Sequence, residues 1–180
     1  MLLKFSTISS MPSDVIDKYC NRIPSELLQL WKNQGLGYLL NGYLKVINPD
    51  DYLEFVRRTY FRGELAIPIF ITAFGDIITL EEQKYLRIVR YKDGDFISVL
   101  ENMHYFLEDL EDEELLEEYF EIKLYEEAVR HLGPLSYEQC FGFVPLLALG
   151  GQKNVSNIDK VRTLEHLSLI TQITGGVGFD

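Results

Sequence analysis

The feature that most limits how this chain can fold is the stretch over residues 138–151, Glu-Gln-Cys-Phe-Gly-Phe-Val-Pro-Leu-Leu-Ala-Leu-Gly-Gly. Residues 141–149 are nearly all apolar, so they must lie in the core or beneath a partner surface. Gly142 and Pro145 disfavour a helix interior, and the segment is too short and too broken to cross a bilayer. We therefore predict a buried extended segment that turns sharply at Gly150 and Gly151, followed by a helix over about residues 157–172.

The first hundred residues carry a mixture of helix and strand signals. A helix is predicted over residues 24–31, where Pro24 lies in the first turn. The Asn41-Gly42 pair between two apolar runs favours a hairpin over residues 38–46 with a two-residue type I′ turn. Asn48 is expected to cap a helix over residues 49–59. Further strands are predicted at residues 66–73, 77–79, 85–91 and 96–100.

These signals together predict an α+β fold. We expect a mostly antiparallel sheet of four to six strands within residues 38–100, flanked by N-terminal and C-terminal helices. Residues 102–132 have a helical pattern with breaks, which ends at Gly133. No linker or internal repeat interrupts the 180 residues, so the prediction is a single domain over residues 1–180.

The charge of the chain is concentrated in one segment. Residues 101–127 contain 12 Asp and Glu but one Lys, a net charge of −11, which equals the net charge of the whole chain. Such a segment repels DNA, RNA and anionic lipid, and it attracts a basic protein. We therefore expect no nucleic-acid or membrane partner.

The cysteines and the hydropathy of the chain bear on its cellular compartment and on metal binding. Cys20 and Cys140 form neither a disulfide framework nor a metal-ligand spacing, and there is no apolar run of membrane length. His104, His131 and His166 also lack the spacing of a metal site. We predict a cytoplasmic protein without a metal or other cofactor.

Four motifs in a fixed order carry a family resemblance. They are a proline-to-tryptophan helix followed by glycine at residues 24–35, Asn-Pro-Asp-Asp-Tyr at 48–52, Thr-Ala-Phe-Gly-Asp at 72–76, and the glycine-bounded motif at 142–151 with Glu-His-Leu at 165–167. This series resembles the bacterial GAD-like family with an immunity-protein C-terminal domain, found beside toxic DNase effectors of type VI secretion. The resemblance implies a GAD-like part at about residues 1–100 and an immunity-protein part at about 101–180.

The resemblance also implies a function. Family members are antitoxins, which bind a cognate toxin and block it, and here the toxin would be a nuclease with a basic surface. The motif residues are expected to build the scaffold rather than to react. These residues are Gly75, Asp76, Gly142, Pro145, Gly150, Gly151 and His166.

The acidic segment has two interpretations. It is either a solvated helix face or a docking surface for a basic nuclease, whose rim must attract phosphate. A calcium loop is disfavoured because the Asp-x-Asp-x-Asp-Gly pattern is absent. If the segment docks a toxin, the contact residues would be Glu108, Glu111, Asp112, Glu114, Glu117 and Glu118.

Two other function classes stay open from the sequence. One is a small hydrolase that uses Asp76 or Cys140 with His166, which requires these side chains to meet in one pocket. The other is a generic adaptor for some other basic protein. The main prediction is a protein with no catalytic residues.

Overall fold

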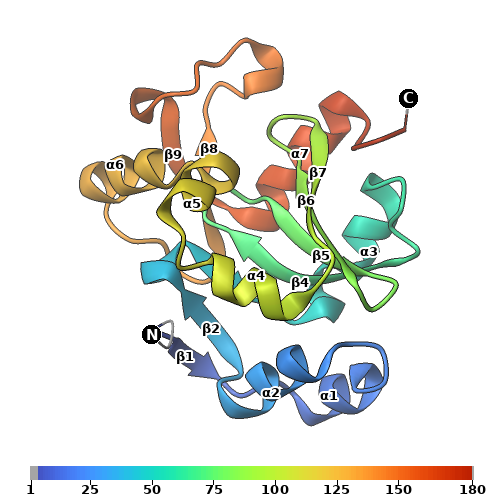
Figure 1. Cartoon of the computed structure of the whole chain (residues 1–180). Coiled ribbons are helices and arrows are strands. Elements are labelled where there is room, and N and C mark those ends of the chain that lie inside the picture. The colour runs from blue at the N-terminus through green and yellow to red at the C-terminus, as the bar shows by residue number, and fades with distance from the viewer. Residues whose placement is uncertain (1–3, 180) are drawn as a thin grey trace.

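A computed structural model describes residues 4–179 of the chain. Its centre is one antiparallel sheet in which each strand pairs with the next one in sequence, so the sheet is a simple meander (Figure 1). The strands are β1 (Ser6–Ser9), β2 (Leu36–Leu39), β3 (Leu44–Val46), β4 (Ala66–Thr72), β5 (Ile77–Glu81), β6 (Tyr85–Arg90) and β7 (Asp95–Leu100).

Helices and a second, small sheet surround the meander. The helices are α1 (Ser13–Tyr19), α2 (Ser25–Asn33), α3 (Pro49–Thr59), α4 (Met103–Asp109), α5 (Glu113–Phe120), α6 (Ile122–Leu132) and α7 (Thr163–Thr174). Short 3₁₀ turns are η1 (Leu40–Gly42), η2 (Leu147–Leu149) and η3 (Val155–Asn157). The small sheet consists of β8 (Gln139–Phe143) paired antiparallel with β9 (Ile158–Arg162).

Both faces of the large sheet are covered, which explains why its middle strands are apolar throughout. Every residue of β4 and β5 is buried. In β5, Ile78 and Leu80 belong to the core shared with α2, α4 and α6, whereas Ile77 belongs to the core shared with α3 and α7. A strand that is buried on both faces has no polar alternation, as the sequence of β4 shows. Pro68 is tolerated within β4 because the register shifts between Pro68 and Phe70.

The α+β class, the antiparallel sheet and the flanking helices are confirmed. The helix predicted at 49–59 is α3, and the Asn48 side chain accepts a hydrogen bond from the Asp50 amide at its start. The sheet has seven strands because residues 6–9, which carry only a weak apolar pattern, pair with β2 at the edge. All four residues of this edge strand are exposed, so hydrophobic periodicity gave no sign of it.

Two local predictions of secondary structure need correction. The hairpin at residues 38–46 exists, but Leu39 pairs with Leu44 across four connecting residues, so the two-residue type I′ turn is wrong. The helix predicted from residue 157 begins at Thr163, because residues 158–162 form β9 against β8.

The apolar stretch over residues 141–149, which was predicted to be buried, is only half buried. Residues 140–143 lie in the core as part of β8, but Val144 and Leu149 are 55% and 61% exposed. The chain leaves the core at the cis Val144-Pro145 bond and forms η2 at the surface. The sharp turn at Gly150 and Gly151 is confirmed, since Gly150 has φ of 85° and the Gly151 amide donates to the Leu146 carbonyl.

Within residues 4–179, no helix has the length and apolar character needed to cross a membrane.

Candidate functional site

The acidic segment folds into three short helices whose boundaries are set by local capping. Asn102 accepts a hydrogen bond from the His104 amide at 2.8 Å and begins α4. Asp112 accepts hydrogen bonds from the amides of Glu114 and Leu115 and begins α5. Glu121 adopts a left-handed conformation with φ of 54°, which ends α5 and lets α6 begin at the next residue in a new direction.

The bend between α5 and α6 forms a groove of ≈ 840 Å³. We call it the acidic groove. Its lining residues are Leu40, Asn41, Glu113, Glu114, Leu116, Glu117, Glu118, Ile122, Lys123, Tyr125 and Glu126. The rim is therefore rich in carboxylates, whereas Leu116, Ile122 and Tyr125 give it an apolar floor. A groove of this kind can receive a cationic chain that also carries an apolar side chain.

The six predicted contact residues divide into two groups. Glu114, Glu117 and Glu118 line the acidic groove. Glu108, Glu111 and Asp112 lie at exposed positions along α4 and the α4–α5 connection and do not line it. Asp112 also has a structural task as the cap of α5. Whether any of the six touches a partner stays a prediction.

Sequence reasoning missed the residues that close the groove from the side of the large sheet. Leu40 and Asn41 come from η1, and the Tyr125 hydroxyl donates a hydrogen bond to the Asn41 carbonyl at 2.9 Å. The Asn41-Gly42 pair showed that the chain turns here. It carried no sign that a helix more than eighty residues further along the chain packs on this turn.

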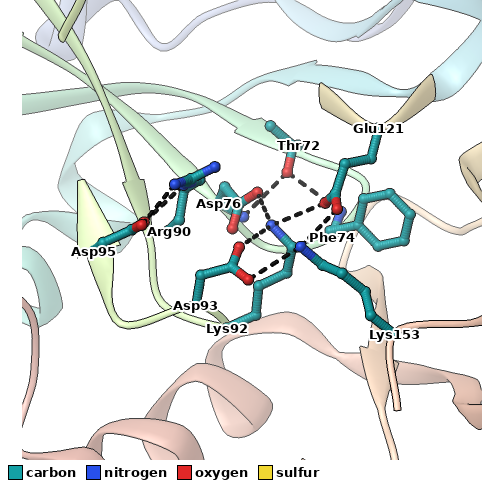
Figure 2. Close-up of polar contacts among 9 residues, drawn as sticks. All are labelled: Thr72, Phe74, Asp76, Arg90, Lys92, Asp93, Asp95, Glu121 and Lys153. Carbon is teal, nitrogen blue, oxygen red and sulfur yellow. Dashed lines mark hydrogen bonds and ion pairs between the residues drawn. The ribbon is translucent and has the colours of Figure 1, made fainter. Parts of the chain in front are cut away.

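An ionic cluster lies at the α5–α6 junction, around the buried side chains of Lys92 and Asp76 (Figure 2). The Lys92 ammonium is 2.7 Å from the Asp76 carboxylate and 3.0 Å from that of Asp93. It is also 3.4 Å from Glu121. Lys153 pairs with the same Glu121 at 2.6 Å and with Asp93 at 3.1 Å. The cluster thus connects the large sheet, the α5–α6 junction and the loop between η2 and η3.

The charged groups of this cluster shift one another's pKa values. Burial lowers the pKa of Lys92, but the carboxylates of Asp76, Asp93 and Glu121 together raise it above its ordinary value. Burial raises the pKa of Asp76, and Lys92 offsets this rise only in part. Lys92 therefore stays protonated, and its positive charge is committed to the cluster.

Asp76, which the sequence assigns to the scaffold, lies in the turn between β4 and β5. The Thr72 hydroxyl accepts the amide hydrogen bonds of Phe74 and Asp76, at 3.3 and 3.1 Å. The Asp76 carboxylate instead accepts from Lys92. This partner could not be predicted from local spacing, because Lys92 lies sixteen residues away in the turn between β6 and β7.

The other motif residues meet where the small sheet packs on the large one. The Phe141 amide donates to the Ala73 carbonyl at 2.7 Å, and the rings of Phe74 and Phe143 stack at 6.1 Å. A Cβ atom on Gly75 would lie 3.4 Å from the Cys140 sulfur, and one on Gly142 would lie 2.6 Å from the His166 ring. These glycines therefore allow close packing of the two sheets and α7.

The side chains of the hydrolase alternative do not share a cleft among the described residues. Burial raises the pKa of the Cys140 thiol to about 11, so the thiol is neutral at physiological pH. Burial also lowers the pKa of His166. The cavity beside His166 measures ≈ 10 Å³, room for about one water molecule. Asp76 is held by Lys92 rather than by His166.

A second buried lysine ties β3 to the chain before β8. Lys45 is fully buried and donates to the carbonyls of Ser136, Tyr137 and Gln139. Burial lowers its pKa to about 8. The three carbonyls satisfy the ammonium group, so Lys45 has a structural role in holding this turn.

No group of three or more His, Cys, Asp or Glu side chains able to hold a metal ion occurs within residues 4–179. This finding includes the acidic helices, where the carboxylates are spread along the rim.

Comparison with known proteins decides the family. The sequence pattern of the GAD-like domain matches residues 3–92, and that of "T6SS immunity protein Tdi1, C-terminal" matches residues 100–174. The chain belongs to the GAD-like family of type VI secretion immunity proteins. The resemblance seen in the motifs is thereby confirmed, and membership implies that a toxin is the partner.

A solved structure shares the fold. The crystal structure of Atu4351 from Agrobacterium tumefaciens superposes with a TM-score of 0.73, covering 93% of this chain and 85% of that one, at 20% sequence identity. At this identity the likeness concerns the fold alone. No curated protein matches the chain.

Proposed function

We propose that this immunity protein neutralises a secreted nuclease by docking its acidic helices on the basic surface around the nuclease active site. The observation that carries the proposal is the acidic groove, whose carboxylates gather at one bend of the chain. A nuclease must attract phosphate, so the rim of its active site carries Lys and Arg. An acidic surface can therefore replace the nucleic acid there and exclude it.

The mechanism we propose involves no chemistry by this chain. Lys92 and Asp76 are buried and paired with each other, and the motif residues Gly75, Gly142 and His166 are used in packing. Inhibition would follow from occupancy alone: while the toxin is covered, its substrate cannot enter. We place this encounter in the cytoplasm, where free thiols such as those of Cys20 and Cys140 are usual.

We further propose that the GAD-like part and the immunity-protein part act as one domain of 180 residues. Residues from both parts share one core, in which Phe70 packs against Phe106 at 5.7 Å and Phe74 packs near Phe141. The acidic helices therefore pack against the sheet, rather than being connected to it by a flexible linker alone.

Co-expression tests the function. The cognate toxin gene is induced in a sensitive host, alone and together with the immunity protein. We expect growth arrest with DNA degradation in the first case and normal growth with intact DNA in the second. If growth is rescued while DNA is still intact in cells that carry the toxin alone, the partner is a toxin of another class. If the pair does not associate and growth is not rescued, the proposal fails.

A further inference from the structure

The acidic groove combines apolar and charged side chains, and a helix face that only contacts water does not require this combination. Leu116, Ile122 and Leu40 are half-buried in its lining, and Tyr125 is buried with its ring 5.1 Å from Tyr43. A helix that serves only solubility presents polar residues to water and turns its apolar residues to the core. Here apolar side chains remain accessible between carboxylates.

Two residues of the groove lining, and a third residue beside it in the chain, have an unusual backbone conformation. Leu40, Asn41 and Glu121 all have positive φ, at 51°, 54° and 54°, although none is glycine. Side chains with a Cβ rarely adopt this region, and such residues persist where the surrounding structure holds them. Asn41 is held by Tyr125, and Glu121 is held by Lys92 and Lys153. The groove is therefore preformed, which lowers the entropy cost of binding.

The five glutamates that line the groove differ in their surroundings. Of the five glutamates that line it, Glu117 accepts a hydrogen bond from the Lys123 amide at 3.0 Å. Glu114, Glu118 and Glu126 are exposed. Among the described residues of the lining, Lys123 is the one cation, so the lining has a net charge of −4. This potential favours an occupant with several positive charges.

We infer that the acidic groove receives one basic segment of the toxin, in which an apolar side chain is flanked by Lys or Arg. The apolar side chain packs on Leu116, Ile122 and Tyr125, and the flanking cations pair with Glu114, Glu118 and Glu126. This inference rests on the proposed function and narrows it, because it assigns the anchoring contact to the groove rather than to the whole acidic face. A polyamine would match the charge, but it would leave the apolar floor without a specific partner.

Two neighbouring leucines provide the decisive comparison. Leu116 lines both the acidic groove and a small cavity beside Phe106 and Tyr119, whereas Leu115, also half-buried on α5, lines the small cavity but not the groove. The probe is the purified cognate toxin carrying an inactivating substitution, and affinity is measured by calorimetry. We expect Leu116→Ala to weaken binding at least about tenfold and Leu115→Ala less than about threefold. Circular dichroism and thermal unfolding show whether both variants keep the fold.

A second pair of variants keeps the test valid if Leu116→Ala fails to fold. Glu114→Gln with Glu118→Gln removes two rim charges from exposed positions, and Asp17→Asn with Glu64→Asn removes two exposed charges elsewhere. We expect only the first pair to weaken toxin binding by about tenfold or more.

The outcomes separate the two proposals. If the toxin binds the wild-type protein but none of the groove variants changes its affinity, the groove inference is wrong and the proposed function stands. If the toxin does not bind the wild-type protein, the proposed function itself is wrong. If Glu114→Gln with Glu118→Gln weakens toxin binding but a folded Leu116→Ala protein binds the toxin as tightly as the wild type, the groove selects charge alone and the inference is overturned.

Discussion

Gly142 shows how a single residue without a side chain fixes the joint between the two sheets. It lies on β8 with its backbone against the His166 ring and the Val161 side chain. A Cβ atom there would lie 2.6 Å from the ring and 2.7 Å from the valine, closer than real contacts allow. His166 is buried on α7 and Val161 is half-buried on β9, so moving either side chain away disturbs the packing of its element.

We therefore expect Gly142→Ala to lower the free energy of unfolding by about 2 kcal/mol through overpacking. The measurement is urea unfolding at neutral pH. His166→Ala in the same chain removes one of the two clashes, so the double variant should recover part of the loss. If the Gly142→Ala protein is as stable as the wild type, the packing around residue 142 is looser than in the structure.

Lys45 gives the protein a pH dependence that can be measured. Burial lowers its pKa from an ordinary 10.5 to about 8, so between these values the unfolded chain binds more protons than the folded one. Stability contributed by this group therefore rises with pH across that window. From about pH 7.5 to 9.5, the free energy of unfolding of the wild type should rise by about 2 kcal/mol relative to Lys45→Met.

Urea unfolding of both proteins at the two pH values checks this expectation, because all other titrations are common to the pair. Equal changes with pH in the two proteins would mean that Lys45 has the same pKa folded and unfolded. The Lys45→Met protein should be less stable throughout, since three carbonyls lose their donor.

At the scale of elements, the Lys92 cluster connects three parts of the chain that are distant in sequence. Asp76 and Lys92 belong to turns of the large sheet, Glu121 to the α5–α6 junction, and Lys153 to the loop after η2. Lys92 is only 8% exposed. Removing a buried cation leaves carboxylates that are expensive to keep charged.

We expect Lys92→Met to cost about 3–5 kcal/mol of stability, whereas Arg58→Ala, which breaks the exposed pair with Glu54, should cost less than about 1 kcal/mol. Adding Asp76→Asn to Lys92→Met should cost less than the sum of the single effects, because the second change removes a carboxylate that the first left unpaired. Strictly additive losses in a double-mutant cycle would show that the pair is not coupled.

The elements that could be predicted from the sequence are those with local signals. The helix at 49–59 has its cap and first-turn proline within three residues of each other, and the strands at 66–100 have β-rich runs separated by turn residues. Residues 158–162 carried no such signal: they are a strand because β8 pairs with them. The groove likewise depends on tertiary contact between η1 and α6. The acidic rim could therefore be predicted from the local sequence, but the apolar floor and the shape of the groove could not.

At the scale of the whole molecule, both sequence halves contribute to one core, and this has a thermodynamic consequence. Trp31 is buried in that core at 1% exposure on the N-terminal side, while β8 and α6 contribute Phe141 and Ala128 to it. We expect one cooperative transition in which Trp31 fluorescence and far-UV circular dichroism change together. Two separate transitions would mean that residues 1–100 and 101–180 unfold independently, contrary to the single domain we propose.

The central claim is that this protein acts by placing an acidic surface on a basic toxin. The most direct test is the association rate with the inactivated cognate toxin, measured for the wild type, for Glu114→Lys with Glu118→Lys, and for Asp17→Lys with Glu64→Lys as a control of equal charge change. We predict that reversal in the groove slows association by about tenfold or more at low salt, that the control changes it little, and that added salt slows the wild type. A wild-type rate that does not depend on salt, together with equal rates for the two reversed variants, would contradict the account.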